Sequence, residues 1–204
     1  MDHVIVMIKR ILLAASIYVC ALTAGCSTHV VVMSEHPSIL IKPLPYKIGL
    51  VLNNSFTNYS FTREKDDEKI IISLGDSQTE LFKKIFDSMF LEATRFQSKL
   101  LAKTGSLDLF VIASVDELQL SLPKETSVNV FEIWIKYKLE IFDQDGSLIT
   151  EWLVSSYGRT QTRFLKSQER ALNQATKAAL RDAGAQIIVG LKTVPAIRDW
   201  VDKK

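Results

Sequence analysis

The sequence predicts an α+β fold: a two-layer sandwich in which two helices pack on one face of a mainly antiparallel sheet of four or five strands. One observation is the alternation of apolar and polar side chains over residues 128–142, which is typical of a strand with one buried face. A second is the recurrence of apolar residues at three- and four-residue steps in residues 77–93 and 166–191. The third is a composition of 47% hydrophobic and 24% charged residues in a chain of 204, which suits one globular domain.

The amino-terminal segment has the parts of a secretory signal peptide. Lys9 and Arg10 precede an apolar run over residues 11–24, which ends in small residues before Cys26. As a helix this run would extend about 21 Å, short of the roughly 30 Å hydrocarbon core of a bilayer. We therefore expect residues 1–25 to be removed, and a translation start at Met1 or at Met7 would give the same mature chain.

Leu22-Thr23-Ala24-Gly25-Cys26 resembles the lipobox of bacterial lipoproteins, although that family most often has Leu where Thr23 stands. The resemblance implies cleavage before Cys26, a diacylglycerol group on its thiol and an acyl chain on its amino group. Together such chains hold a protein stably on a membrane, whereas a single chain binds only marginally. Ser27 implies sorting to the outer membrane, with the domain on the periplasmic side. No other cofactor is expected.

The mature chain should begin with a tether over residues 26–45, because its prolines favour an extended path, followed by a single α+β domain over residues 46–204. Residues 46–52 have the composition of the first strand, and the charged residues 63–69 are expected to turn a short hairpin. The spacing of Ser77 and Glu80 predicts a capping box at a helix start. The apolar stripe of this helix should comprise Leu81, Phe82, Ile85, Phe86, Met89, Phe90 and Ala93.

Three strands should follow, over residues 107–122, 128–142 and 147–157, with a turn at residues 143–146. A hairpin loop of either two or four residues pairs positions whose numbers sum to an odd value, so Thr150, Trp152 and Val154 should share the apolar face. The last helix, residues 166–191, has an apolar side made mainly of alanines, which lets a helix approach a sheet closely. The solvent face of the strands should carry Trp134, Lys136, Lys138, Leu153 and Tyr157.

Composition argues against catalysis and nucleic-acid binding. The charge balance, 25 Lys and Arg against 23 Asp and Glu, is too even for a dedicated nucleic-acid binder. All three histidines and both cysteines lie at or before His36, so the domain beyond it has neither a Ser-His-Asp site nor a His or Cys zinc shell. Asp116 and Glu117 are neighbours on a strand and should point to opposite faces. Glu140 and Glu151 should approach each other as an exposed pair, so we expect no enzyme and no metal.

Two surface groups are candidates for binding. Trp134, Lys136, Lys138 and Tyr157 form a predicted aromatic and cationic patch for a protein partner, since aromatic side chains are enriched at interface centres. The alternative is that another segment covers this patch. Arg159, Arg163 and Lys166 follow the last strand and are candidates for binding anionic glycolipid phosphates. The alternative for these three is a solvated loop that enters the last helix.

The order of elements behind the lipobox resembles that of the lipopolysaccharide-assembly lipoproteins of the Lpt pathway, although the insertion at residues 56–73 departs from them. The resemblance implies a non-enzymatic outer-membrane lipoprotein that serves as an accessory or assembly factor of an envelope transport complex. Two alternatives stay open. One is a carrier that binds the acyl chains of a lipid or glycolipid between helix and sheet, and the other is an activator of a cell-wall synthase.

Overall fold

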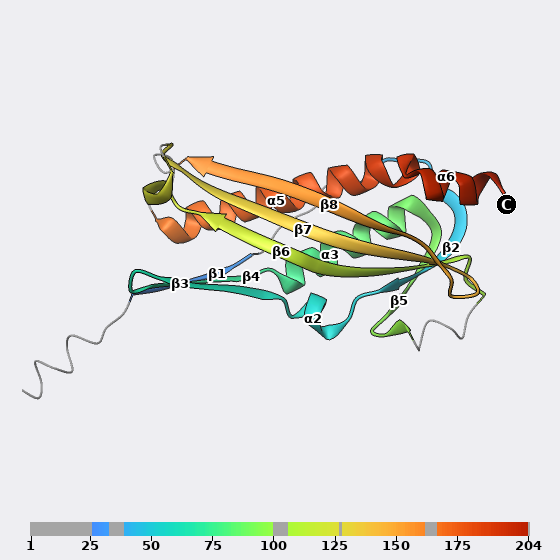
Figure 1. The fold of residues 1–204 in the computed structure, drawn as a ribbon, viewed down its shortest axis with the longest axis horizontal. Helices are drawn as coiled ribbons and strands as arrows, with labels where there is room; N and C mark the ends of the chain where they lie inside the picture. The colour runs from blue at the N-terminus through green and yellow to red at the C-terminus, as the bar shows by residue number, and fades with distance from the viewer. Residues whose placement is uncertain (1–25, 33–38, 100–105, 127, 162–166, 204) are drawn as a thin grey trace, which may run out of the picture.

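The computed structural model describes residues 26–32, 39–99, 106–126, 128–161 and 167–203 (Figure 1). The predicted signal peptide therefore lies outside the described residues. The fold is α+β, as predicted, with helices and strands at β1 (Cys26–Val31), β2 (Leu44–Val51), α2 (Asn54–Thr57), β3 (Ser60–Lys65), β4 (Glu68–Ser73), α3 (Gly75–Met89), β5 (Phe90–Phe96), β6 (Leu109–Ser121), η1 (Pro123–Glu125), β7 (Val130–Asp143), β8 (Leu148–Gln161), α5 (Gln168–Gly190), η3 (Leu191–Thr193) and α6 (Pro195–Asp202).

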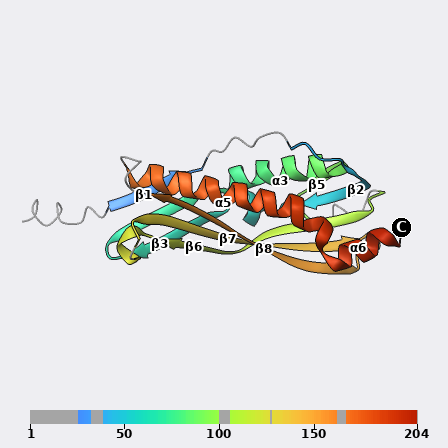
Figure 2. The same ribbon diagram turned by 90° about the horizontal axis from the view of Figure 1, so that it is seen from above.

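The main sheet has five strands in the order β5-β2-β6-β7-β8. Strands β6, β7 and β8 are antiparallel, as predicted, but β2 runs parallel to both of its neighbours, so the sheet is mixed. Parallel neighbours need a crossover, and α3 is part of the connection between β2 and β5. Helices α3 and α5 lie on the same side of this sheet (Figure 2), and the main hydrophobic core lies between them and the strands.

The alternation in β7 sorts its side chains between the two faces as predicted. Phe131, Ile133, Ile135, Tyr137, Leu139 and Ile141 are all buried toward the helices. The predicted odd sum of paired positions in β7 and β8 is also confirmed: Leu139 pairs with Trp152, and Trp134 pairs with Tyr157. The turn between the strands contains Gly146 at a φ of 84°, in the left-handed region that favours glycine.

A second sheet of three strands, in the order β1-β4-β3, contains the predicted hairpin. Its turn residues Asp66 and Asp67 have φ values of 52° and 58°, the positive values that a tight two-residue hairpin turn requires. Strand β1 was not predicted, because residues 26–31 belong to the expected tether. They pair instead with β4, in parallel, since Val30 and Val32 can be buried there at 0% and 2% exposure.

The N-terminal cap and the end of α3 correct two expectations. The helix begins at Gly75 and its N-cap is Leu74, which makes no side-chain cap, so the capping box at Ser77 and Glu80 is wrong. Ser77 is instead buried within the first turn. The chain leaves the helix after Met89, and Phe90 and Ala93 belong to the edge strand β5. Strand β5 was missed because Phe90 and Ala93 happen to continue the helical spacing of apolar residues.

A buried polar contact joins α3 to the sheet. The Tyr137 hydroxyl donates to Gln78 Oε1 at 3.1 Å, and Gln78 Nε2 donates to the backbone oxygen of Phe56 at 2.6 Å. Tyr137 is fully buried, and this burial raises the pKa of its hydroxyl far above the ordinary value. Its polar atom is thus satisfied inside an aromatic cluster with Phe56 and Phe82.

Helix α5 lies unusually close to β8. Four of the nine buried residues of α5 are alanines, at positions 171, 175, 179 and 183, and the helix backbone at Ala175 and Ala179 faces Gly158 of β8. A Cβ atom built on Gly158 would lie 2.0 Å from the Ala175 carbonyl oxygen and 2.3 Å from the Ala179 amide nitrogen. The short distance between helix and sheet therefore requires small residues on both elements.

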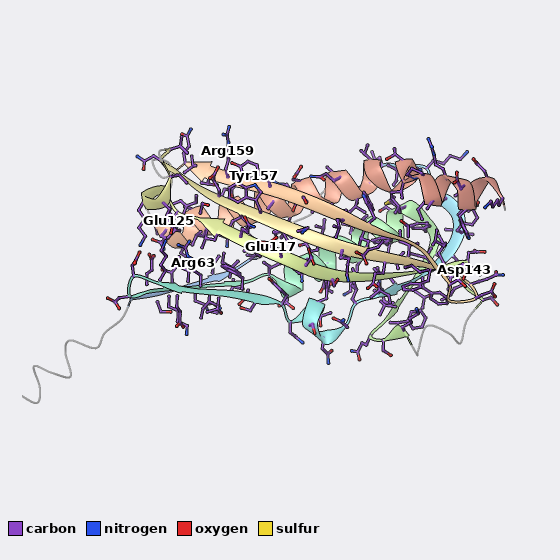
Figure 3. All side chains as sticks on the ribbon, viewed as in Figure 1. Arg63, Glu117, Glu125, Asp143, Tyr157 and Arg159 are labelled. Atoms are coloured by element: carbon purple, nitrogen blue, oxygen red, sulfur yellow. The ribbon has the colours of Figure 1, made fainter. Side chains whose placement is uncertain are left out.

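Ion pairs fasten the smaller sheet to the end of β6. The Arg63 guanidinium forms a bidentate pair with Glu125 and also donates to the Leu120 carbonyl oxygen at 3.0 Å (Figure 3). Lys65 Nζ lies 2.9 Å from the same carboxylate. The hydrogen bond from Arg63, together with that from Lys65, lowers the pKa of the Glu125 carboxyl well below its ordinary value.

We predict that Gly158→Ala destabilises the fold by roughly 1–3 kcal/mol, the usual cost of overpacking a close contact, because the obstacle is helix backbone that must shift. The matched control is Gly184→Ala on α5, where a Cβ would lie 3.1 Å from the flexible end of Leu81. Alanine also gains about 1 kcal/mol of helix propensity there. Urea unfolding of both variants measures the difference, and equal losses would refute the close-packing account.

We also predict that Glu125→Gln lowers the free energy of unfolding by about 1 kcal/mol near neutral pH, a discounted value for a partly exposed ion pair. Because the pKa of Glu125 is depressed in the folded state, its stabilisation is fully present above the ordinary value of 4.5. It is lost as the pH falls through the folded value. Unfolding curves of the variant and the wild type should converge progressively below about pH 4, and a constant gap down to acid pH would contradict this.

Candidate interaction surface

The candidate surface is the face of the β6–β8 strands that points away from α3 and α5, which we call the outer face. Side chains on it alternate with the core residues of each strand, so their positions follow from the register. The outer face, as defined here, consists of Asp116, Glu117, Gln119, Glu132, Trp134, Lys136, Lys138, Glu140, Glu151, Leu153, Tyr157 and Arg159.

An aromatic pair occupies one part of the outer face. The Trp134 and Tyr157 rings have centroids 5.0 Å apart at 40°, and Trp134 is 36% exposed. The Tyr157 hydroxyl donates to Glu132 Oε1 at 2.6 Å. Burial and this hydrogen bond to a carboxylate both raise the pKa of the Tyr157 hydroxyl. Leu153, on the same strand as Tyr157, is 46% exposed. The structure thus brings the predicted members Trp134 and Tyr157 together.

The two predicted cations of the patch are not available as free positive charges. Lys136 Nζ lies 2.9 Å from Asp116 Oδ2 and 3.9 Å from Glu117 Oε2. Lys138 Nζ lies 4.0 Å from Glu140 and 3.9 Å from Glu151. With Arg159 included, three cationic side chains share the outer face with five carboxylates. The predicted patch therefore consists of an aromatic pair beside ion-paired lysines, on a surface with more carboxylates than cations.

A bulge in β6 overturns the expectation for Asp116 and Glu117. The register with β7 shifts between Val115 and Glu117, so that Asp116 is an extra residue in the strand. Both carboxylates then reach the ammonium group of Lys136. Glu140 and Glu151 pair directly across the ladder, as predicted, and share Lys138. In the part of the chain that the structure describes, no three metal-binding side chains gather into a site.

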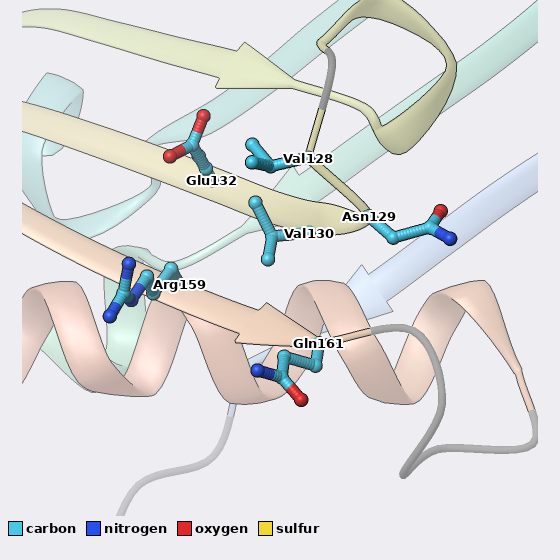
Figure 4. A pocket seen from close by; sticks show the side chains of 6 residues that line it. All are labelled: Val128, Asn129, Val130, Glu132, Arg159 and Gln161. Carbon is cyan, nitrogen blue, oxygen red and sulfur yellow. The ribbon is translucent and has the colours of Figure 1, made fainter.

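Arg159 is exposed near the open end of β7 and β8 and lines a shallow pocket there (Figure 4). The other lining residues are Val128, Asn129, Val130, Glu132 and Gln161. Glu132 is the cross-strand partner of Arg159, so a carboxylate shares the site predicted to bind an anion. Arg163 and Lys166, the other two residues of that prediction, lie outside the described residues.

A small apolar cluster, which sequence reasoning missed, covers the opposite end of the same face. Val51, Leu107, Phe110 and Phe142 are buried in it, and the Lys99 ammonium lies 3.3 Å from the centre of the Phe142 ring. The signal in the sequence is the doubly apolar run at residues 109–113, whose alternate members can be buried on two faces. The open part of the outer face is therefore the part that carries Trp134 and Tyr157.

No known protein family and no curated protein matches the sequence. Among solved structures, protein XCC0632 of the DUF330 family from Xanthomonas campestris has a TM-score of 0.55 at 9% identity, over 88% of this chain and 99% of that one. A minor lipoprotein from Acinetobacter baumannii has a TM-score of 0.44 at 10% identity, over 72% and 90%. Uncharacterized lipoprotein B from Nitrosomonas europaea has a TM-score of 0.42 at 16% identity, over 82% and 97%.

The similarity to the Xanthomonas campestris protein extends over nearly the whole of that chain and shows a shared fold. At 9% identity it carries no information on which residues act. Within the described ranges, no helix combines the length and apolarity that crossing a bilayer requires.

Proposed function

We propose that the chain is a bacterial lipoprotein held by acyl chains on Cys26 at the periplasmic face of the outer membrane. Its domain acts without chemistry of its own, as an accessory or assembly factor of an envelope transport or assembly complex. It binds a protein partner through the open part of the outer face. The observation that carries this proposal is the pair formed by Trp134, which is 36% exposed, and the half-buried Tyr157, 5.0 Å apart between ring centroids, on two long strands.

The fixed position of this pair favours binding. Tyr157 is held by its hydroxyl to Glu132 and by its backbone N–H, which donates to Asp182 at 2.9 Å. The Tyr157 side chain of this protein therefore loses little conformational entropy when a partner covers it. Large aromatic side chains ringed by polar groups are also the composition of interface hot spots.

The charges around the pair favour a protein over a phosphate-rich ligand. Lys136 and Lys138 already have carboxylate partners within 4.0 Å. A phosphate group would have to displace those carboxylates, whereas Lys and Arg side chains of a protein could approach the surplus acidic groups. An activator of a cell-wall synthase would use the same kind of contact. This alternative therefore differs from the proposal only in which protein is bound.

The packing between helix and sheet gives less support to an acyl-chain carrier. Phe82, Phe86 and Tyr137 are at 0% exposure between the layers. Phe82 contacts Phe56 edge-on at 4.9 Å between ring centroids. A carrier would have to separate these rings, and each large apolar side chain removed from the core costs about 1.5–3 kcal/mol.

We predict that a photo-crosslinking amino acid at Leu153 captures a protein in intact cells, and that adding Trp134→Ala reduces this capture. Loss of a central aromatic contact costs about 2 kcal/mol, or roughly 30-fold in affinity. The matched control carries the crosslinker at Val189, which is 72% exposed on α5, on the other side of the molecule. Mass spectrometry of the crosslinked bands identifies the partner.

Capture at Leu153 that is as strong with Trp134→Ala as without it contradicts the proposed role of the aromatic pair. Equal capture at Val189 would contradict the assignment to the outer face. Acyl lipid that copurifies with the domain in the absence of any captured protein would replace the proposal with the carrier function.

We further predict that Cys26→Ser, which removes the thiol proposed to carry diacylglycerol, removes the protein from the outer-membrane fraction and leaves it as an uncleaved precursor without acyl chains, because the proposed cleavage follows acylation. The reason is that the acyl chains supply the membrane affinity. Ser27→Ala, at the neighbouring position, is the matched control and should stay with the membrane. Density-gradient fractionation and the intact mass of each chain measure the effect. A Cys26→Ser protein that is cleaved before residue 26 and remains in the outer-membrane fraction like the wild type would refute the anchor.

A further inference from the structure

Strand β1 leaves no free length of chain between Cys26 and the folded domain. Cys26 pairs with Glu68 and the pairing continues in register to Val31 and Ser73. The side chains along the strand hold it in place: Val30 is fully buried, His29 Nε2 lies 3.1 Å from Ser73 Oγ, and Asn173 Nδ2 donates to the Val31 carbonyl oxygen at 3.0 Å. The residue proposed to be acylated is thus the first residue of a sheet.

Cys26 also lies at one extremity of the molecule. Its neighbour Ser27 lines a shallow depression together with residues 64–69, which include the β3–β4 turn. The β3–β4 turn and the β7–β8 turn lie at opposite ends of the long axis in both views (Figures 1 and 2). Strand β7, with 14 residues, alone spans about 46 Å at ~3.3 Å per residue.

We propose that the protein stands end-on on the lipid surface, with the β3–β4 turn at the headgroups and the β7–β8 turn projecting away. This rests on the proposed acylation of Cys26. The backbone of β1 enters the fold from Cys26, so its amino group is at the outer end of the strand. Acyl chains attached there extend away from the domain. Without a flexible tether, the domain cannot turn its other faces onto the bilayer.

The chemistry of this end suits the hydrated headgroup layer. It carries positive and negative side chains joined as ion pairs, namely Lys65 with Glu125, Lys124 with Glu68 and Lys69 with Glu64. Such a surface can stay hydrated beside zwitterionic headgroups, and it has no reason to enter the hydrocarbon. The pair of Arg63 with Glu125 ties the hairpin to β6, so the orientation of the hairpin is passed on to the main sheet.

The test uses the full lipidated protein with one added cysteine, because Cys20 leaves with the signal peptide and the Cys26 thiol is acylated. A fluorophore is placed at Glu64→Cys, beside the β3–β4 turn, or at Asp145→Cys, in the β7–β8 turn; both sites are exposed. Each protein is reconstituted into vesicles of phosphatidylethanolamine and phosphatidylglycerol that contain a nitroxide on the lipid headgroup. We expect several-fold stronger quenching at position 64 than at position 145.

A matched variant inserts about 12 Gly and Ser residues after Ser27, which adds a flexible reach of roughly 20 Å. It should keep the protein on the vesicles but remove most of the difference between the two labels. Equal quenching at both positions without the insert, in protein that floats with the vesicles, overturns the end-on orientation alone. Protein that carries no acyl chains by mass and does not float overturns the proposed anchor and this orientation with it.

Discussion

The contact between α5 and β8 at Gly158 is the constraint on which the other features depend. With only backbone on the strand side and alanines on the helix side, the two elements approach until main-chain atoms meet. That approach commits one face of the long strands to the core. The charged and aromatic side chains of β7 and β8 are therefore left on the opposite face, where the same alternation that builds the core also displays Trp134 and Tyr157.

Because the core takes every second residue, the outer face is set by register and not by loops. Trp134 and Tyr157 are direct cross-strand partners, and so are Glu140 and Glu151. The lysines between them are satisfied by neighbouring carboxylates. An ion-paired surface with a surplus of carboxylates and two rings in it differs from the cationic patch that the lysine positions alone suggest. The difference lies in residues of β6 and β8 that are distant in sequence.

Local periodicity was enough to predict β7, its hairpin to β8 and the faces of both strands, since period two and turn chemistry are properties of neighbouring residues. It failed where the outcome depends on distant partners. Strand β1 exists because Val30 and Val32 find space beside β4, and β5 exists because β2 offers an edge next to Phe90. The bulge at Asp116 likewise shows only once β6 is aligned with β7, and it brings together two carboxylates that strict alternation would separate.

The edge of the main sheet at β8 has a further consequence. An unpaired edge strand is a template for another chain, and proteins that expose one risk joining edge to edge. Here the amide of Tyr157 is used by Asp182, and Gln186 donates to the Ser155 carbonyl oxygen at 2.8 Å. Helix α5 thus occupies, with two side chains, two of the backbone groups that a foreign strand would need in the middle of β8. In a crowded compartment this favours recognition through the side chains of a face and discourages polymerisation through the backbone.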